Sequence, residues 1–493
     1  MVESIENASD IFPQSADVER CEEQEPNSAQ QLDLSRTAPV TNPTRAPVCG
    51  HLLQLWGEGE HRNLAGNITH LAWQLSFAQL EALSSSLRAL VARHRILAAR
   101  VEEDERGIHL FIDERFVPEI QVIDLRHSSA TNHWTTLEKR AGEIAYECVW
   151  RPFEFDIQSR RSGPLMRSFL IILSDERSIF GIVVNHVLAD FMALVIIGRD
   201  MRRFYDNYLS GKASRYPPLR ISFMDYLINL DAWLQSSGGQ SATAHWKARI
   251  GNTPQFRLPP DAQPPPTPSA PYGMLAFKVP SAAFEPMRTY ARQQHSTLFI
   301  LFLVAQFASI MKVSGKTHGL INVVHLGREQ PRLYNLVGCF GSYVPFRIAM
   351  RSTCTFAEVV ADVTRRWGED SRELSRCSLS AAEGYPGFNF VDYPTDAGAG
   401  PFSVPYPIPW PEPSGERSDR YYLDMVLERR CQGWHGLMFY RNDLHAERTI
   451  KEFVVDILAL LNLAIYIPDQ SLDQLLSSID LPQYRKPFEG VFQ

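Results

Sequence analysis

The chain of 493 residues has 44% hydrophobic and 21% charged side chains, so it can bury a large core and should divide into at least two lobes. Its formal net charge of −7 lies mostly in the first 46 residues, which hold nine acidic and three basic side chains. The remainder is close to neutral and has no basic run, so the charge gives no reason to expect nucleic-acid binding.

The seven cysteines are scattered, with no C-x-x-C pair and no histidine cluster at metal-ligand spacing. This pattern is typical of reduced thiols in a cytosolic protein, and it predicts no metal site. No apolar stretch reaches about 18 uncharged residues, and the N-terminus lacks a basic region followed by an apolar one. We therefore expect a cytoplasmic protein that neither spans a membrane nor is secreted.

The first part of the chain predicts an acidic tail followed by alternating helices and strands. Residues 1–46 are polar and poor in aromatic side chains, which predicts a disordered tail; a docking role for it stays open. The clearest helix is expected at 76–94, capped by Ser76, with His94 as a satisfied core histidine. A second helix is expected at 134–146, and strands at 107–112, 120–124, 168–173 and 179–184, the last two forming a hairpin.

The stretch 179–191 is the most informative of the chain. A short apolar run typical of a buried strand ends at Asn185 and His186, and Asp190 follows one helical turn after His186. From Phe191 onward apolar residues recur at helical spacing. The polar residues therefore lie where a strand becomes a helix, and active sites favour such junctions.

The second part of the chain predicts another helical and stranded lobe after a proline-rich connector. The connector at 258–271 can form neither helix nor central strand, so we expect it to cross between lobes. Helices are expected at 223–234, 243–250, 282–294, 297–311, 356–369 and 450–463. Strands are expected at 319–325, 342–350, 421–427 and 436–440, with a loop at 383–418.

Several short motifs carry little weight alone. His-x-x-x-Asp occurs twice, and the copy at 109–113 lies within a strand pattern, so we discard it. The sequence at 315–317 resembles the end of a phosphate-binding loop, but Ile310 stands where the first glycine is needed. No G-x-S-x-G elbow or dinucleotide-binding glycine pattern occurs. A transferase without metal or cofactor therefore remains open.

Several weak motifs in the right order together resemble one family, the condensation domains of nonribosomal peptide synthetases. These domains belong to the chloramphenicol-acetyltransferase-like acyltransferase superfamily, and the resemblance extends over most of residues 50–480. In the first half the matching segments are 93–97 (RHRIL), 152–153 (PF), 163–167 (GPLMR) and 185–191 (NHVLADF). In the second half they are 245–246 (HW), 258–259 (LP), 327–328 (GR), 337–347 (VGCFGSYVPFR) and 388–390 (FNF).

The resemblance implies a mixed α/β (α+β) fold of two chloramphenicol-acetyltransferase-like lobes in a V, with His186 in a tunnel between them. It implies that His186 is the catalytic residue, and that Asp190 is a structural brace paired with Arg328. Arg167 is a second candidate partner for Asp190, and ordinary surface ion pairs are the alternative for both arginines. The expected boundaries are a tail at 1–46, an N-terminal lobe at 47–215 and a C-terminal lobe at 216–493.

Some residues depart from the family pattern. Asn185 replaces a first histidine that related acyltransferases also lack, and it argues against the cyclising subgroup. Phe191 replaces a glycine, and its side chain would narrow the acceptor channel or shape it for a small acceptor. Gly341 and Ser342 stand where the family usually has valine and asparagine. We expect Phe191, Gly341 and Ser342 to line the substrate channel.

The resulting functional expectation is a free-standing, monomeric condensation enzyme that joins an acyl group to an amine or hydroxyl. The donor would be carried on the phosphopantetheine of a carrier protein supplied in trans, and the acceptor would be small or carrier-bound. The chain itself would bind no cofactor. Two alternatives stay open: a coenzyme-A-dependent acyltransferase, and an inactive condensation-like domain that only recruits partners.

Overall fold

Strand β1 (Arg45–Pro47) is the first element among the described residues, and it pairs with β4 (Gly107–Ile112) in antiparallel register. Arg45 and Ala46 therefore belong to the fold, which corrects the end of the predicted tail. The rest of that tail up to residue 42 lies outside the described residues. The computed structural model describes residues 43–57, 67–126, 134–212, 216–251, 253, 256–263, 272–377, 379, 384–392, 402, 404–409, 422–430 and 433–492.

A five-stranded sheet carries the predicted hairpin of the N-terminal lobe. Its strands, in spatial order, are β14 (Val404–Pro405), β2 (Ile68–Leu75), β9 (Arg177–Asn185), β8 (Met166–Ser174) and β5 (Ile120–Asp124). Strands β8 and β9 are antiparallel neighbours, so the hairpin is confirmed. Every residue of β9 after Arg177 is buried, which explains the continuous apolar run in its sequence.

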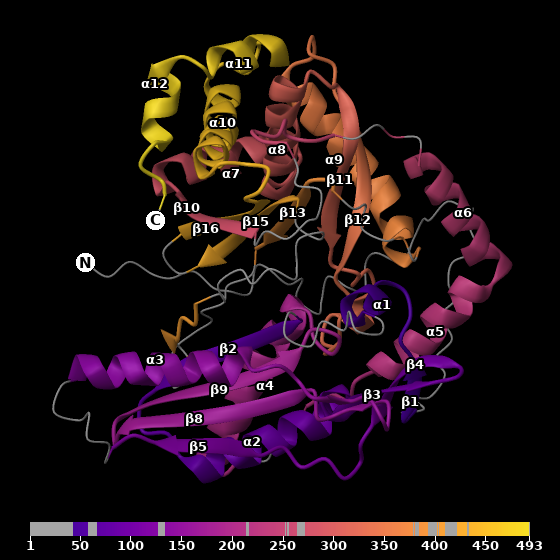
Figure 1. Cartoon of the computed structure of the whole chain (residues 1–493), viewed down its shortest axis with the longest axis vertical. Helices are drawn as coiled ribbons and strands as arrows, with labels where there is room; N and C mark the ends of the chain where they lie inside the picture. Colours follow the sequence, from indigo (N-terminus) through magenta and orange to yellow (C-terminus); the bar gives the residue numbers. More distant parts are fainter. Residues whose placement is uncertain are drawn as a thin grey trace. The chain divides into compact units, whose positions relative to one another are not determined.

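Helices cover both faces of this sheet (Figure 1). Helix α3 (Trp134–Trp150) lies on the sheet face that carries His70. The centres of the His70 and Trp150 rings are 5.4 Å apart. Helices α2 (Leu80–Arg93) and α4 (Phe191–Leu209) pack against each other, and α4 approaches the opposite face at Trp73. Smaller elements complete the lobe: α1 (His51–Trp56), a 3₁₀ helix at Arg95–Ala98, and a second sheet in the order β1, β4, β3 (Ala99–Asp104), β7 (Arg161–Ser162) and β6 (Phe155–Asp156).

Helix α2 begins later than its sequence predicts. Gln79 occupies the N-cap position without a side-chain capping bond, so the prediction that Ser76 caps this helix is wrong. Strand β2 extends to Leu75, and Phe77 adopts a left-handed φ of 55°, so the chain turns before the helix can start. The prediction for His94 is confirmed, because this buried side chain lies 2.9 Å from a carboxylate oxygen of Asp200.

The C-terminal lobe is built on a mixed six-stranded sheet. Its order is β10 (Tyr272–Val279), β16 (Gly433–Arg441), β15 (Leu423–Arg430), β13 (Gly387–Val391), β11 (His318–His325) and β12 (Ser342–Ala349). Strand β13 pairs in parallel with both β11 and β15. The prediction of a loop at 383–418 is therefore wrong at β13, a short strand between glycine-rich and proline-rich segments.

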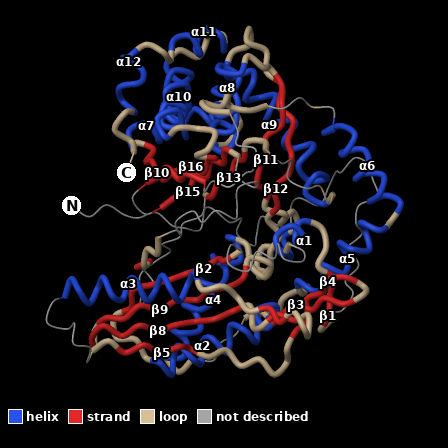
Figure 2. Tube along the Cα trace, viewed as in Figure 1, coloured by secondary structure: helices blue, strands red, loops and turns tan. Residues whose placement is uncertain are grey.

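Helices gather on one side of this second sheet, as Figure 2 shows in blue beside the red strands. They are α7 (Ser281–Gln293), α8 (Leu298–Ser314), α9 (Phe356–Arg376), α10 (Glu447–Tyr466), α11 (Leu472–Ser478) and α12 (Pro482–Arg485), with 3₁₀ turns at Pro331–Leu333 and Lys486–Phe488. Helix α8 is almost wholly buried, as its apolar sequence predicted. Together the two lobes confirm the predicted mixed α/β fold.

The two hydrophobic cores place the lobe crossing before the proline-rich connector. Helix α5 (Phe223–Gln235) buries Phe223 and Leu227 in the first core, whereas α6 (Ser237–Gly251) buries Trp246 in the second. Leu258 also packs in the second core, so the prediction that residues 258–271 cross between lobes is wrong. The boundary between the two hydrophobic cores lies near residue 236, later than the lobe boundary expected at 215/216. Residues 40–493 form one compact unit.

A buried carboxyl in the second sheet gives a testable pH dependence. Asp424 on β15 lies opposite Gly387 on β13, where a Cβ atom would clash with the Asp424 carboxylate. Burial raises the pKa of the Asp424 carboxyl to about 8. An unfolded aspartate has a pKa near ~3.9, so between about pH 4 and 8 the folded chain keeps a proton that the unfolded chain releases.

We therefore expect Asp424 to make the protein less stable as the pH rises through this range. Relative to an Asp424→Asn variant, the free energy of unfolding of the wild type should fall by about 1.4 kcal/mol for each pH unit between about pH 4 and 8. Denaturant titrations at several pH values would measure this difference. If the unfolding free energies of the wild type and of Asp424→Asn changed equally with pH across this range, the prediction would be contradicted.

Candidate active site

His186 directly follows the last residue of the buried strand β9. The peptide N–H of His186 donates to the carbonyl oxygen of Asn67 at 2.7 Å, and a turn follows in which the N–H of Leu188 donates to the carbonyl of Asn185. The His186 side chain is partly exposed, whereas its neighbours from Gly181 to Asp190 are buried. The strand therefore carries an imidazole out of the core to a partly open position.

Asp190 is the N-cap of helix α4, and both of its carboxylate oxygens are occupied. Oδ1 accepts from the N–H of Ala193 at 2.7 Å and from Arg328 at 2.9 Å. Oδ2 accepts from the N–H groups of Phe340 and Gly341 at 2.9 and 3.1 Å. With four donors around a side chain that is 8% exposed, this carboxylate joins α4 to the segment before β12 and has little capacity left to accept a substrate proton.

Arg328 is the buried partner of Asp190 and reaches it from the other half of the chain. Its guanidinium also donates to the carbonyls of Leu333, Leu336 and Gly338 at 2.7 to 3.1 Å, and it lies 4.2 Å from the centre of the Phe340 ring. The arginine therefore holds the loop between β11 and β12 against α4. The preceding Gly327 has a φ of 65°, and a Cβ there would clash with the Phe340 carbonyl oxygen, so the turn requires glycine.

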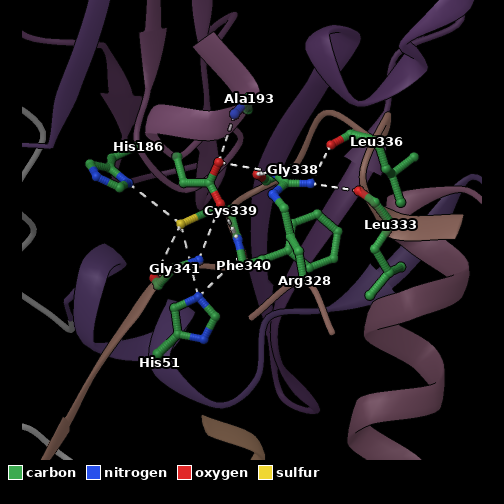
Figure 3. A network of polar contacts seen from close by, with 11 residues as sticks. His51, His186, Ala193, Arg328, Leu333, Leu336, Gly338, Cys339, Phe340 and Gly341 are labelled. Atoms are coloured by element: carbon green, nitrogen blue, oxygen red, sulfur yellow. Dashed lines mark hydrogen bonds and ion pairs between the residues drawn. The ribbon is translucent and has the colours of Figure 1, made fainter. Parts of the chain in front are cut away.

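Cys339 and His51 complete the site, and no sequence motif pointed to either role. Figure 3 shows the sulfur of Cys339 between the rings of His186 and His51. Sγ lies 3.4 Å from Nδ1 of His186 and 3.9 Å from Nε2 of His51. Nε2 of His51 also lies 3.1 Å from the carbonyl oxygen of Cys339. His51 opens the short helix α1, 135 residues before His186, and no local pattern links the two.

Comparisons with known proteins identify the family of the chain. A family model described as "Condensation domain" matches residues 72–371. The chain belongs to the condensation-domain family. A linear gramicidin synthase polypeptide of Brevibacillus parabrevis is 24% identical over 287 residues, which cover 58% of this chain and 4% of that protein. The chain thus matches only a small part of this much longer synthase.

Two solved structures share the fold of this condensation domain. The complex of the X-domain and OxyB from teicoplanin biosynthesis matches with a TM-score of 0.68 and 20% identity, covering 89% of this chain and 97% of that one. The SgcC5 protein from Streptomyces globisporus matches with a TM-score of 0.67 and 19% identity, covering 86% and 100%. At these identities the likeness establishes the fold.

The residues that depart from the family pattern lie around the same turn of the condensation domain. Asn185 is fully buried, and its Oδ1 accepts from the N–H of Val187 at 3.0 Å, so it shapes the turn. Phe191 begins α4 with a partly exposed side chain. Ser342 opens β12 opposite His325, and its buried hydroxyl has no hydrogen-bond partner among the described residues. A Cβ on Gly341 would contact only Asp190 and the His325 carbonyl, at 3.7 to 3.9 Å.

Arg167 does not contact Asp190, so its candidacy as a partner is wrong. Its guanidinium donates to the carbonyls of Cys148, Val149 and Arg151 and therefore caps the end of α3. The two residues of the discarded motif at 109–113 have other neighbours, since His109 lies 3.7 Å from Asp104 and Asp113 pairs with Arg100.

The described part of the condensation domain offers no obvious place for a metal or a membrane span. It contains no group of three or more His, Cys, Asp or Glu side chains that could hold a metal ion. No single described helix has the length and apolar composition to cross a membrane, and α7 and α8 pass that test only as a pair bent by 102°.

Proposed function

We propose that this chain is a condensation enzyme that transfers an acyl group from the phosphopantetheine thioester of a carrier protein to an amine or hydroxyl. The observation that supports the proposal is the difference in surroundings between His186 and Asp190 at the turn after β9. The imidazole of His186 is partly exposed, whereas both oxygens of the Asp190 carboxylate are occupied by four donors. His186 is therefore the group that can meet substrate, and Asp190 is a brace.

The proposed reaction needs one base and no covalent enzyme intermediate. The acceptor nitrogen or oxygen forms a bond to the thioester carbonyl carbon, the carbon–sulfur bond breaks, and the thiol leaves on the carrier arm. His186 takes or directs the acceptor proton, which returns to the departing thiolate. An ordinary histidine has a pKa near ~6.5 and is largely neutral at cellular pH, so it suits this task. The chain would supply no cofactor of its own.

The substrates would meet in a tunnel between two lobes in a V, with His186 inside it. Support for this arrangement comes from the loop between β11 and β12, whose buried side chains Arg328 and Cys339 contact Asp190 and His186 of the first half. We propose that the carrier protein is a separate chain that works in trans, and that the condensation enzyme acts as a monomer in the cytoplasm.

Two other functions remain as competing candidates. A coenzyme-A-dependent acyltransferase would use the same histidine with a different carrier of the thioester. A domain that only recruits partners is favoured by two observations: the likeness to the X-domain solved with OxyB, and Phe191 at a position where the family resemblance expects glycine. In that case the partly exposed histidine would meet no thioester.

One assay separates these three functions. The purified chain is mixed with carrier proteins loaded with acyl groups, or with the same acyl groups on coenzyme A, over a panel of amines and alcohols. Intact-mass spectrometry then follows loss of the acyl group from the carrier, and product is detected directly. Turnover with carrier donors supports the proposal, and turnover with coenzyme A alone supports the first alternative. Carrier binding without turnover of either donor supports recruitment.

Phe191 gives a prediction about acceptor choice. If its side chain narrows the acceptor channel, Phe191→Ala should lower the KM for bulkier acceptors by about 10-fold or more, as expected for the space of a few methylene groups. Steady-state kinetics over acceptors of graded size would measure this. Phe77→Ala, at a phenylalanine that is 65% exposed, is the control. The same acceptor preference in wild type and Phe191→Ala would remove Phe191 from the channel.

A further inference from the structure

The thiol of Cys339 lies within hydrogen-bonding distance of Nδ1 of His186. Its sulfur is 3.4 Å from Nδ1 of His186, and the side chain is fully buried. A neutral histidine carries its proton on one ring nitrogen only, and the partner of that nitrogen decides whether the other can accept a proton. The contact at Nδ1 therefore bears directly on what Nε2 can do.

His51, on the other side of the sulfur, cannot take the thiol proton. Its Nε2 lies 3.1 Å from the carbonyl oxygen of Cys339, and a carbonyl only accepts, so this nitrogen carries a proton. Burial lowers the pKa of His51 to about 4, so the ring is neutral near pH 7 and Nε2 holds its single proton. His51 is thus a donor toward Cys339.

The thiol proton has another acceptor in the carbonyl oxygen of Gly341. This oxygen lies 4.0 Å from Sγ, within range for a weak sulfur hydrogen bond. Burial raises the pKa of the Cys339 thiol well above its ordinary value, so the thiol keeps its proton. A buried, protonated thiol is a poor nucleophile, so an acyl group on Cys339 is not expected. The sulfur lone pairs then remain to accept the N–H of His186.

From this geometry we infer that Cys339 is a positioning residue, which accepts a hydrogen bond from Nδ1–H of His186 and so leaves Nε2 without a proton. The opposite arrangement, with S–H donating to Nδ1, would place the proton on Nε2 and prevent it from accepting one from the substrate. In that arrangement the weak S–H donor would bond to Nδ1 of His186, and the carbonyl oxygen of Gly341 would no longer accept a hydrogen bond from the thiol. The inference rests on the proposed function of His186, because only a proton acceptor needs an unprotonated Nε2.

The test combines a spectroscopic readout with kinetics in the full chain. Nitrogen-15 NMR of histidine-labelled protein reports which ring nitrogen of His186 is protonated, and the signals are assigned by their loss in His186→Ala. The variants are Cys339→Ala, which removes the acceptor, and Cys339→Ser, which keeps one. Cys377→Ala is the matched control, because that cysteine is also buried but packs in the second core. Circular dichroism verifies that each variant is folded.

We expect His186 to be protonated at Nδ1 in the wild type, in Cys339→Ser and in Cys377→Ala, and to shift toward protonation at Nε2 in Cys339→Ala. Turnover in Cys339→Ala should fall on the order of 10-fold at unchanged KM, since a wrong histidine tautomer impairs a general base. Turnover in Cys339→Ser should stay within about 3-fold of wild type.

Two results would overturn the inference: an Nε2-protonated His186 in the wild type, or an unchanged tautomer in Cys339→Ala. The tautomer measurement needs no substrate, so it separates this inference from the proposed function. An Nδ1-protonated wild type that turns over no acyl donor would refute the proposed function while leaving the contact between Cys339 and His186 intact.

Discussion

Replacing His186 with alanine is expected to lower the turnover of acyl transfer by about 100- to 10,000-fold, the usual contribution of a positioned acid or base. The loss should fall on kcat more than on KM, because the imidazole acts on the proton that moves during bond formation. The side chain is partly exposed at the end of β9, so its removal leaves no large cavity and the variant should remain folded. Product formation with a loaded carrier measures the effect.

The control for this prediction is His318→Ala, since His318 is an exposed histidine at the start of β11. It should keep wild-type turnover, which shows that loss of an imidazole in itself does no harm. A folded His186→Ala that turns over the loaded carrier at the wild-type rate would exclude His186 as the catalytic residue.

Replacing Arg328 with alanine is expected to lower the free energy of unfolding by about 3–5 kcal/mol, because it strands a buried charge. Asp190 would keep its three backbone donors but lose its cationic partner, and three carbonyls of the loop before β12 would each lose the hydrogen bond from the guanidinium. Arg328→Lys should recover only part of the loss, since a lysine cannot bond the carboxylate and three carbonyls with one planar group. Denaturant titration followed by circular dichroism measures both variants.

The control is Arg126→Ala, which removes an arginine that also pairs with two carboxylates, Asp124 and Asp175, but at the surface. Exposed ion pairs contribute little, so its unfolding midpoint should stay at the wild-type value. An Arg328→Ala variant that unfolds at the same denaturant concentration as wild type would contradict the brace. A double variant, Asp190→Asn with Arg328→Met, should be more stable than Arg328→Ala, because it leaves no unpaired charge.

The site brings together residues that lie far apart in the chain, so the sequence does not show that they are in contact. Asp190 and Arg328 are 138 residues apart, and Cys339 is 153 residues from His186. The family resemblance pointed to the first of these contacts through two motifs, 185–191 and 327–328. No motif pointed to His51 or to the thiol, because a cysteine in a stretch such as 337–340 is equally typical of a buried core residue.

Local patterns predicted most elements of the fold and failed where the tertiary structure sets the answer. The apolar run of β9 and the periodicity of α8 each need only a buried environment, so composition revealed them. The start of α2 depends on where β2 ends. The formation of β13 depends on parallel pairing with its two neighbouring strands. The local sequence reveals neither of these. The crossing between cores occurs between α5 and α6, at a short Ser-Gly stretch (236–239) whose signal is weaker than that of the longer proline-rich connector.

By itself, the sequence determined that a strand delivers Asn185 and His186 to the start of a helix, because hydrophobic period is a property of neighbouring residues. Only the tertiary structure decided which groups surround that histidine. Contacts across more than a hundred residues depend on packing between lobes, and burial of the loop before β12 brings Arg328 to Asp190 and Cys339 to His186. The same packing surrounds the Asp190 carboxylate with hydrogen-bond donors and leaves the His186 imidazole partly exposed.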